Sequence, residues 1–304
     1  MRWSKQKVLI TGAAGFLGSA LGRQLKEKVV GISVLDDLST GAKENVTKFA
    51  DEFVRERVTT SALSRFKDID IVFHFGAPSS IILFERNPNS LAETVEGMKA
   101  VLDYCQSSHV RKLVYASSSS VYGKTMIPQS EETLAAPINE YGVAKLCCEH
   151  MARIRPEVNS TGLRIFAGYG PGEGRKVGFC SVIGIFLANL SANESPIIFG
   201  SGKQTRDFVF VDDIVDCTLK AADNDYRGVI NVGSGESKNF LELLELISAQ
   251  TNRKIIPKFV PEPKLYFEHT RADTTRLRSV LDVRPITVEM GMARYLERIG
   301  FPLN

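Results

Sequence analysis

Short apolar segments alternate with longer amphipathic segments along most of this 304-residue chain. The apolar segments, each bounded by Gly, Asp or Ser, predict buried strands at residues 8–10, 29–35, 71–75, 113–116, 163–166 and 229–232. The amphipathic segments predict helices at residues 16–28, 91–107, 141–154, 211–222 and 240–251. Because strand and helix alternate, we expect right-handed crossovers and an α/β fold of the Rossmann type, with a doubly wound parallel sheet.

The alternation weakens after residue 166. A glycine-rich stretch at 168–178 precedes an apolar helical pattern at 179–190, and prolines interrupt regular structure from Pro257 onward. We therefore predict two domains rather than one. Residues 1–166 and about 207–250 would form the sheet domain, and residues 167–206 and about 254–304 a smaller C-terminal substrate-binding lobe.

Composition narrows the class of protein. Charged residues make up 24% of the chain and the net charge is only +3, so we expect no nucleic-acid partner. No apolar stretch is long enough for a signal segment or a membrane span, and we expect a soluble cytoplasmic protein. The five cysteines include no C-x-x-C pair, which favours reduced thiols and no metal site.

A glycine turn follows the first predicted strand and opens the first helix. Gly12, Gly15 and Gly18 let the backbone approach a pyrophosphate closely, and Phe16 and Leu17 begin a helix whose free N–H groups attract the anion. Together they predict a dinucleotide cofactor.

The second predicted strand ends in a carboxylate about twenty residues later. Asp36 can accept bonds from both hydroxyls of an adenosine ribose and would repel a 2′-phosphate, which favours NAD over NADP. The ends of later strands should also reach the cofactor. We expect these further contacts from Asp37, Ser39, Thr40, Gly41, Phe75, Gly76, Ala77, Ser117, Tyr141 and Lys145. His74 also stands near the end of a predicted strand, and we expect it to be packed rather than catalytic.

Tyr141 and Lys145 form a candidate proton-transfer pair. Four residues apart, they lie on one helix face, where the ammonium group can favour the phenolate. An ordinary tyrosine pKa is about 10, so the phenol needs such help to act as a base at neutral pH. Residues 117–120 are four serines that supply hydroxyl donors at a strand end. We therefore expect chemistry between a carbonyl and an alcohol.

An ordered set of motifs covers nearly the whole chain: T-G-A-A-G-F-L-G, V-L-D-D-L-S-T-G, V-F-H-F-G-A, Y-A-S-S-S-S-V-Y-G, Y-G-V-A-K, L-R-I-F-A-G-Y-G-P and G-S-G-K-Q-T-R-D-F-V-F-V-D-D. Taken together, this set resembles the extended short-chain dehydrogenase/reductases, in the NAD-dependent nucleotide-sugar epimerase and dehydratase branch. The resemblance implies an NAD-binding sheet domain, a nucleotide-sugar substrate and a homodimer paired through the helices at 91–107 and 141–154. The apolar stripes of those helices could equally be buried within one subunit.

The resemblance also implies roles for individual residues. Ser118 would hydrogen-bond the reacting hydroxyl, Tyr141 would be the base and Lys145 its activator. Tyr141 would take the proton of the sugar 4-hydroxyl while hydride passes to NAD+, giving a transient 4-keto sugar. The resemblance implies these substrate contacts: Ser118, Ser119, Ser120, Tyr141, Ser181, Val182, Arg206 and Thr270.

Two positions narrow the reaction. Nucleotide-sugar dehydratases similar to this chain carry an acid pair where Ser119 and Ser120 stand, and a serine hydroxyl cannot replace a carboxylic acid. This favours a 4-epimerase acting on UDP-glucose and UDP-galactose. Thr270 is small, which predicts that N-acetylhexosamines fit as well. The alternatives are another nucleotide-sugar reductase, dehydratase or decarboxylase of this family, or a non-catalytic NAD-binding sensor.

Three departures from the family pattern keep those alternatives open. Ala167 stands where relatives carry an asparagine that contacts the diphosphate. Thr60 and Ser61 replace an acidic adenine contact, and residues 261–266 lack the usual arginine-containing loop. Each departure removes one expected contact to a nucleotide.

Overall fold

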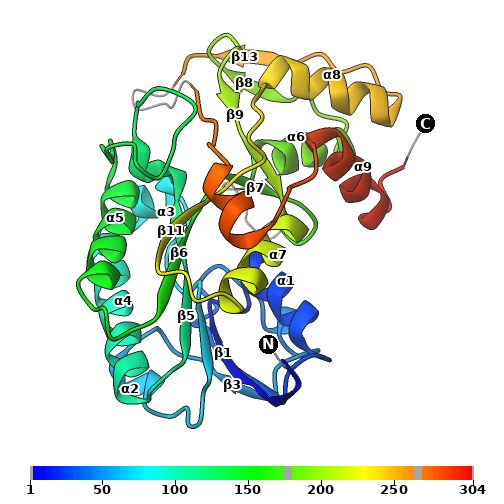
Figure 1. The fold of residues 1–304 in the computed structure, drawn as a ribbon. Helices are drawn as coiled ribbons and strands as arrows, with labels where there is room; N and C mark the ends of the chain where they lie inside the picture. The colour runs from blue at the N-terminus through cyan, green and yellow to red at the C-terminus, as the bar shows by residue number, and fades with distance from the viewer. Residues whose placement is uncertain (1–2, 174–179, 263–268, 303–304) are drawn as a thin grey trace.

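The structure is a computed structural model that describes residues 3–173, 180–262 and 269–302. Parallel strands form its central sheet, in the order β11-β6-β5-β4-β1-β2-β3 (Figure 1). These strands are Lys7–Thr11 (β1), Gly31–Leu35 (β2), Glu52–Val54 (β3), Ile71–His74 (β4), Lys112–Ser118 (β5), Ser160–Ile165 (β6) and Gly228–Val232 (β11). The chain leaves β1 toward β2 and later returns to β4 on its other side, so the doubly wound parallel sheet is confirmed.

Helices cover both faces of the sheet, as Figure 1 shows. Val8 and Ile10 of β1 pack in one core with α1 and α7, whereas Leu9 packs in a second core with α2, α4 and α5. This alternation follows from the two-residue period of a strand that is buried on both sides. The helices are Phe16–Leu25 (α1), Thr60–Leu63 (α2), Ser90–Ser107 (α4), Glu140–Arg153 (α5) and Val211–Ala222 (α7).

The strand β3 was not predicted, and its position explains why. Its three residues form the outer edge of the sheet, and only Val54 among them is buried. An edge strand this short carries no apolar run that could mark it in the sequence. The predicted helix at 16–28 is also too long, because α1 ends at Leu25.

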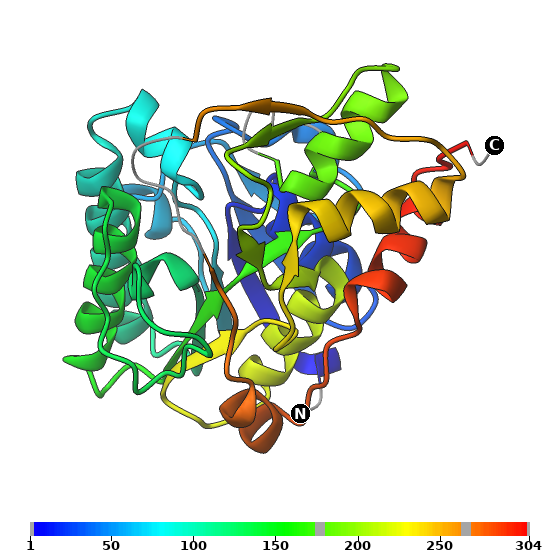
Figure 2. The same cartoon turned by 90° about the horizontal axis from the view of Figure 1, so that it is seen from above.

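A third core lies beyond the sheet. Its helices are Val182–Ser191 (α6), Phe240–Thr251 (α8) and Val288–Arg298 (α9), and its short parallel strands are Ile197–Phe199 (β8) and Lys258–Val260 (β13). In Figure 2 the gold α8 and the red α9 lie across the molecule from the cyan and green helices α4 and α5. The buried side chains of α6, α8 and α9 pack together here, and the division into two domains stays a prediction.

Short elements connect these cores. Two more pairs of strands are Ala167–Tyr169 (β7) with Phe208–Phe210 (β10), and Thr205–Arg206 (β9) with Lys238–Asn239 (β12). The remaining helical turns are Trp3–Lys5 (η1), Lys43–Asn45 (η2), Ile81–Arg86 (α3), Ser119–Tyr122 (η3) and Leu277–Leu281 (η4). The predicted helix at 179–190 begins at Val182, and residue 179 lies outside the described ranges.

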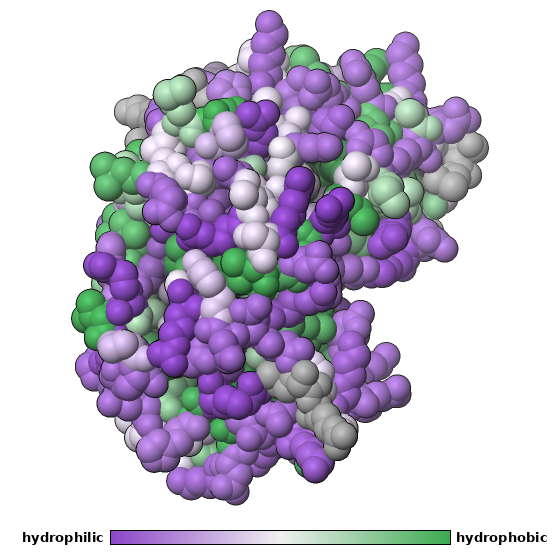
Figure 3. All heavy atoms as spheres, viewed as in Figure 1, coloured by the Kyte–Doolittle hydropathy of each residue, from purple (hydrophilic) through white to green (hydrophobic). Residues whose placement is uncertain are grey.

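The surface is mostly hydrophilic on the face drawn in Figure 3, with hydrophobic residues in small groups. Among the helices of the described ranges, none combines the length and the apolar character that a membrane crossing requires. The apolar stripes of α4 and α5 include Met98, Val101 and Cys148, which are buried in the second core. A homodimer therefore stays a prediction that these stripes do not support.

Candidate active site

A cavity of about 1140 Å³ opens at the carboxyl ends of the central strands. This is the edge where open parallel sheets bind their ligands. Its lining includes every residue that the sequence analysis assigned to a cofactor or substrate, with the exception of Gly41. Gly41 instead packs behind the glycine turn, where an added Cβ would lie 2.6 Å from the Ala14 carbonyl carbon.

The glycine turn leaves no room for side chains at two positions. Gly12 has a φ of +69°, and a Cβ there would lie 2.5 Å from the carbonyl carbon of Phe75. A Cβ on Gly18 would lie 2.3 Å from the carbonyl oxygen of Gly12. The turn is therefore pressed between the end of β4 and the first turn of α1, as close backbone approach to a pyrophosphate requires.

Asp36 already holds the backbone of this turn. One carboxylate oxygen accepts a bond from the Ala14 N–H and the other from the Leu38 N–H, both at 2.8 Å. Burial raises the pKa of this carboxyl, although these two bonds oppose the rise. Each oxygen can accept a second bond, so a contact with ribose hydroxyls stays a prediction.

The residues of this region fit NAD. The N-terminus of α1 lines the cavity with Phe16, Leu17 and Gly18, whose backbone N–H groups belong to the first helical turn and suit a pyrophosphate. Asp36 and Asp37 line the same end and disfavour a 2′-phosphate by their charge. The cavity is also large enough for an extended dinucleotide, since sites for drug-sized ligands measure about 300–1,000 Å³.

The three candidate catalytic residues lie together in the same cavity. Tyr141 is hydrogen-bonded to Ser118, and its ring meets that of Phe84 edge-on at 5.5 Å. The Lys145 ammonium nitrogen lies 5.8 Å from the centre of the Tyr141 ring and donates a bond to the Ala116 carbonyl oxygen at 3.1 Å. The helix α5 that carries both begins next to β5, which carries Ser118.

The sequence predicts a lowered pKa for Tyr141, but in the structure this pKa is raised. Burial raises the pKa of Tyr141, and the hydrogen bond from Ser118 opposes that rise. Burial also lowers the pKa of Lys145. Removing both groups from water disfavours phenolate and ammonium alike, and the lysine alone does not reverse the effect. The side chains of this pair are placed as predicted, but the electrostatic expectation needs correction.

His74 is packed, as the sequence analysis expected. Its side chain is buried, and its Nδ1 lies 2.7 Å from the Thr11 hydroxyl oxygen. That hydroxyl also accepts a bond from the Gly76 N–H. Burial, with a smaller contribution from Lys145, lowers the pKa of His74 to about 3. The ring is neutral at physiological pH and does not act as a base there.

His74 makes the free energy of unfolding depend on pH. Because its folded pKa lies below the usual 6.5, only the unfolded chain binds a proton here between about pH 6.5 and pH 3. The free energy of unfolding should therefore fall by about 2 kcal/mol from this residue between pH 7 and pH 5. Urea unfolding of wild type and His74→Asn at both pH values checks this. Equal losses in the two proteins would contradict it.

Three acidic residues of the cavity gather around Arg57. Arg57 forms an ion pair with Glu93, and its Nε lies 4.0 Å from a carboxylate oxygen of Asp37. It also interacts electrostatically with Glu96. Ser119 and Ser120 line the cavity next to Ser118, whose hydroxyl oxygen accepts the Ser120 N–H at 3.1 Å. Among the lining residues that the structure describes, the carboxylates thus belong to the Arg57 group and to Asp36 and Glu56.

The candidate substrate residues come from the third core and its connections. Arg206 lies 5.6 Å from the Phe240 ring centre and donates to the Thr205 carbonyl oxygen. Ser181 caps α6 and donates a 2.8 Å bond to the buried Glu173 carboxylate, while Val182 begins that helix.

Thr270 also lines the cavity, and its hydroxyl accepts the Asp207 N–H at 3.3 Å. Ala167 lines the same cavity, where relatives were expected to carry an asparagine. Residues 174–179 and 263–268, which include much of the glycine-rich stretch at 168–178 and of the segment 261–266, lie outside the described ranges.

Sequence reasoning missed several lining residues. Arg57 and Glu93 were not considered, because Arg57 follows the unpredicted strand β3 and meets Glu93 only in three dimensions. Ser79 and Cys180 also line the cavity without a motif that marks them. Glu149 was also missed; it contacts the lining residue Ser117 rather than lining the cavity itself. Its spacing was a usable signal, because it follows Lys145 by four residues on the same helix.

A doubly wound sheet, a glycine turn at its switch point and a Ser–Tyr–Lys group in the cavity define an NAD-binding enzyme of the short-chain dehydrogenase/reductase class. Residues 8–233 match the model of the NAD dependent epimerase/dehydratase family, and the chain belongs to that family. NAD is therefore its cofactor.

Solved structures agree with this assignment. The UDP-N-acetylglucosamine 4-epimerase of Methanobrevibacter ruminantium M1 is 27% identical with a TM-score of 0.92, covering 97% of this chain and 98% of that one. The UDP-glucose 4-epimerase of Thermotoga maritima is 28% identical with a TM-score of 0.92, covering 97% and 99%. An NAD-dependent NDP-hexosamine 5,6-dehydratase of tunicamycin biosynthesis is 27% identical with a TM-score of 0.87, covering 97% and 98%.

Proposed function

We propose that this protein epimerises C4 of a nucleotide-activated hexose, with UDP-glucose and UDP-galactose as its substrates. The observation that carries the proposal is the composition of the cavity lining beside Ser118 and Tyr141, where Ser119 and Ser120 supply hydroxyl groups, whereas three of the described lining carboxylates are grouped with Arg57. Removing and returning a hydride at C4 needs one base for one hydroxyl proton. The similarity to two UDP-sugar 4-epimerases supports the same reaction.

Each catalytic residue has a distinct task in this reaction. Ser118 holds the 4-hydroxyl by a hydrogen bond, and Tyr141 takes its proton as C4 is oxidised. Lys145 favours the phenolate electrostatically once Tyr141 loses its proton. NAD+ supplies the hydride acceptor and, once reduced, the donor. The 4-keto sugar must then present its other face before the proton returns from Tyr141.

The substrate diphosphate would be held by Arg206. A guanidinium group suits phosphate because it donates two parallel hydrogen bonds, and stacking near Phe240 limits the movement of this side chain. Ser181 and Val182 would contact the nucleotide from the start of α6. These roles place the sugar between Thr270 and the Ser118–Tyr141 pair.

A dehydratase is the second candidate. The similarity to the NDP-hexosamine 5,6-dehydratase favours it, since that enzyme has the same fold at 27% identity. Water elimination also needs an acid or base for a carbon-bound proton, and Ser119 and Ser120 cannot supply one. An NAD-binding sensor is less well supported, because a sensor has no chemical need for Ser118, Tyr141 and Lys145 together.

The direct test is a panel of UDP-hexoses followed by NMR. We expect the 4-epimer to accumulate to an equilibrium ratio from either UDP-glucose or UDP-galactose. Loss of water from any of these sugars would establish the dehydratase instead. NAD binding without any reaction on UDP- or dTDP-sugars would establish the sensor.

Thr270 is expected to set the size of the sugar that fits. Replacing Thr270 by tyrosine should lower kcat/KM for UDP-N-acetylglucosamine by about 10-fold or more, with a smaller effect on UDP-glucose, because the larger ring fills the space of the N-acetyl group. The matched control is Thr270→Val, which loses the bond to the Asp207 N–H but keeps the volume. A wild-type enzyme inactive on UDP-N-acetylglucosamine would contradict this prediction.

A further inference from the structure

A buried ion pair lies directly behind the candidate catalytic residues. The Glu149 carboxylate on α5 accepts bonds from the Arg164 guanidinium on β6, at 2.9 Å from Nε and 2.7 Å from Nη2. Side-chain exposure is only 7% for Glu149 and 6% for Arg164. The same carboxylate accepts a 2.5 Å bond from the Ser117 hydroxyl. Ser117 immediately precedes Ser118, so the pair is one residue away from the reacting group.

This contact is one of three that hold the helix α5 against the strand β5. Tyr141, Lys145 and Glu149 recur every four residues and so lie along one face of α5. Along that face Tyr141 meets Ser118, Lys145 bonds the carbonyl oxygen of the neighbouring Ala116, and Glu149 bonds the residue between them. Three successive residues of β5 are thus each held by α5.

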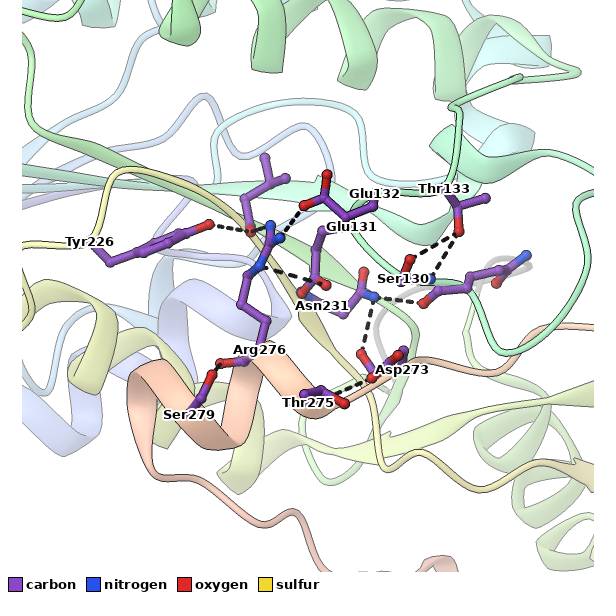
Figure 4. A network of polar contacts seen from close by, with 12 residues as sticks. Ser130, Glu131, Glu132, Thr133, Tyr226, Asn231, Asp273, Thr275, Arg276 and Ser279 are labelled. Carbon is purple, nitrogen blue, oxygen red and sulfur yellow. Dashed lines mark hydrogen bonds and ion pairs between the residues drawn. The ribbon is translucent and has the colours of Figure 1, made fainter.

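Arg164 is itself held in place from the other side. It lies directly opposite Ser117 in the pairing of β5 with β6, and its guanidinium carbon lies 4.8 Å from the Tyr122 ring centre. The Tyr122 hydroxyl donates a 2.6 Å bond to Asn231. Asn231 in turn bonds Glu131 and Asp273, in the polar network of Figure 4. The carboxylate of Glu149 therefore has a fixed partner and cannot follow Ser117 if β5 moves.

We propose that Glu149 is a positioning residue that sets the distance between Ser118 and Tyr141 by holding Ser117. This inference rests on the proposed function for its kinetic consequence, but not for its structural one. A charged, doubly hydrogen-bonded group in a buried site has one low-energy arrangement. Loss of the Ser117 bond would free the end of β5, and a small misplacement of a reacting group is enough to slow a reaction greatly.

Replacing Ser117 by alanine removes its bond to Glu149 and leaves both partners of the ion pair in place. We expect kcat to fall between about 10-fold and 100-fold with KM unchanged, and Ser117→Thr to restore most of the loss. Amide hydrogen exchange should become faster in residues 116–120, a readout that needs no substrate. The matched control is Thr161→Val, which removes the 2.6 Å bond from Thr161 to the Tyr226 carbonyl oxygen near the start of β6; its exchange in 116–120 should equal that of wild type.

A double-variant cycle identifies Glu149 as the partner. Glu149→Leu should slow turnover, and adding Ser117→Ala to it should cause little further loss, because either change removes the bond between Ser117 and Glu149. Unchanged kcat and exchange in Ser117→Ala would overturn the inference, as would additive losses in the cycle. Lower NAD affinity in Ser117→Ala with unchanged exchange in residues 116–120 would show that Ser117 acts through the cofactor contact that the sequence predicts, and it would also overturn the inference. If Glu149→Leu does not fold, Ser117→Ala with its exchange readout still decides. A wild-type enzyme without epimerase activity refutes the proposed function, while the exchange result stands.

Discussion

Replacing Tyr141 by phenylalanine is expected to lower epimerase turnover by about 10²- to 10⁴-fold, the range found when a general acid–base group is removed. The variant lacks only the phenol oxygen that bonds Ser118, whereas its ring can keep the edge-on contact with Phe84. NAD binding and thermal stability should therefore stay close to the wild-type values. Initial rates on UDP-galactose and titration with NAD+ measure the two quantities separately.

A second tyrosine serves as the control. The Tyr226 hydroxyl donates to the Val229 carbonyl oxygen at 3.3 Å, and Tyr226 does not line the cavity. Tyr226→Phe should lose a comparable hydrogen bond without slowing turnover. If Tyr141→Phe kept the activity of this control, Tyr141 would have no part in the mechanism.

Replacing Glu149 by leucine is expected to lower the free energy of unfolding by about 3–5 kcal/mol. Leucine has a similar volume, so little of this loss comes from packing. The loss arises because the Arg164 guanidinium keeps its charge in a buried site after its two bonds to Glu149 are gone. Against a typical stability of about 5–15 kcal/mol this is a large fraction, and urea unfolding measures it directly.

Removing both charges should be much less harmful than removing one. In Glu149→Leu combined with Arg164→Met, no buried charge is left unpaired, and apolar side chains of similar volume can replace an ion pair at little cost. We expect the double variant to be more stable than Glu149→Leu alone. A double variant that is less stable than Glu149→Leu would show that Arg164 stabilises the protein through Tyr122 rather than through Glu149.

The fold could be predicted because its signals are local. The β1 residues Val8 to Ile10 and the helix that follows them carry apolar patterns with the periods of a buried strand and an amphipathic helix. Gly18 is likewise required by a local contact, because an added Cβ would meet the carbonyl oxygen of Gly12. Gly12 can be recognised by its place in the motif, although the atoms that a Cβ there would meet belong to Phe75 and Gly76. The edge strand β3 was missed because its burial depends on one residue, Val54.

The electrostatics of the site could not be predicted in the same way. Sequence spacing places Lys145 beside Tyr141, but only the three-dimensional structure shows that burial acts on both groups and outweighs their proximity. Asp36 accepts bonds from the backbone N–H groups of Ala14 and Leu38. The sequence motif alone does not show whether this carboxylate bonds the backbone or a cofactor. Arg57 and Glu93 meet from segments that are far apart in the chain.

The central claim is that hydride leaves and returns to the same sugar carbon beside Tyr141. Incubating the enzyme with UDP-glucose deuterated at C4 tests it most directly, with the product analysed by NMR. The account predicts UDP-galactose that keeps its deuterium at C4, since a hydride held within the site does not exchange with water. Deuterium lost to solvent, or found at C6 of a dehydrated sugar, would contradict it.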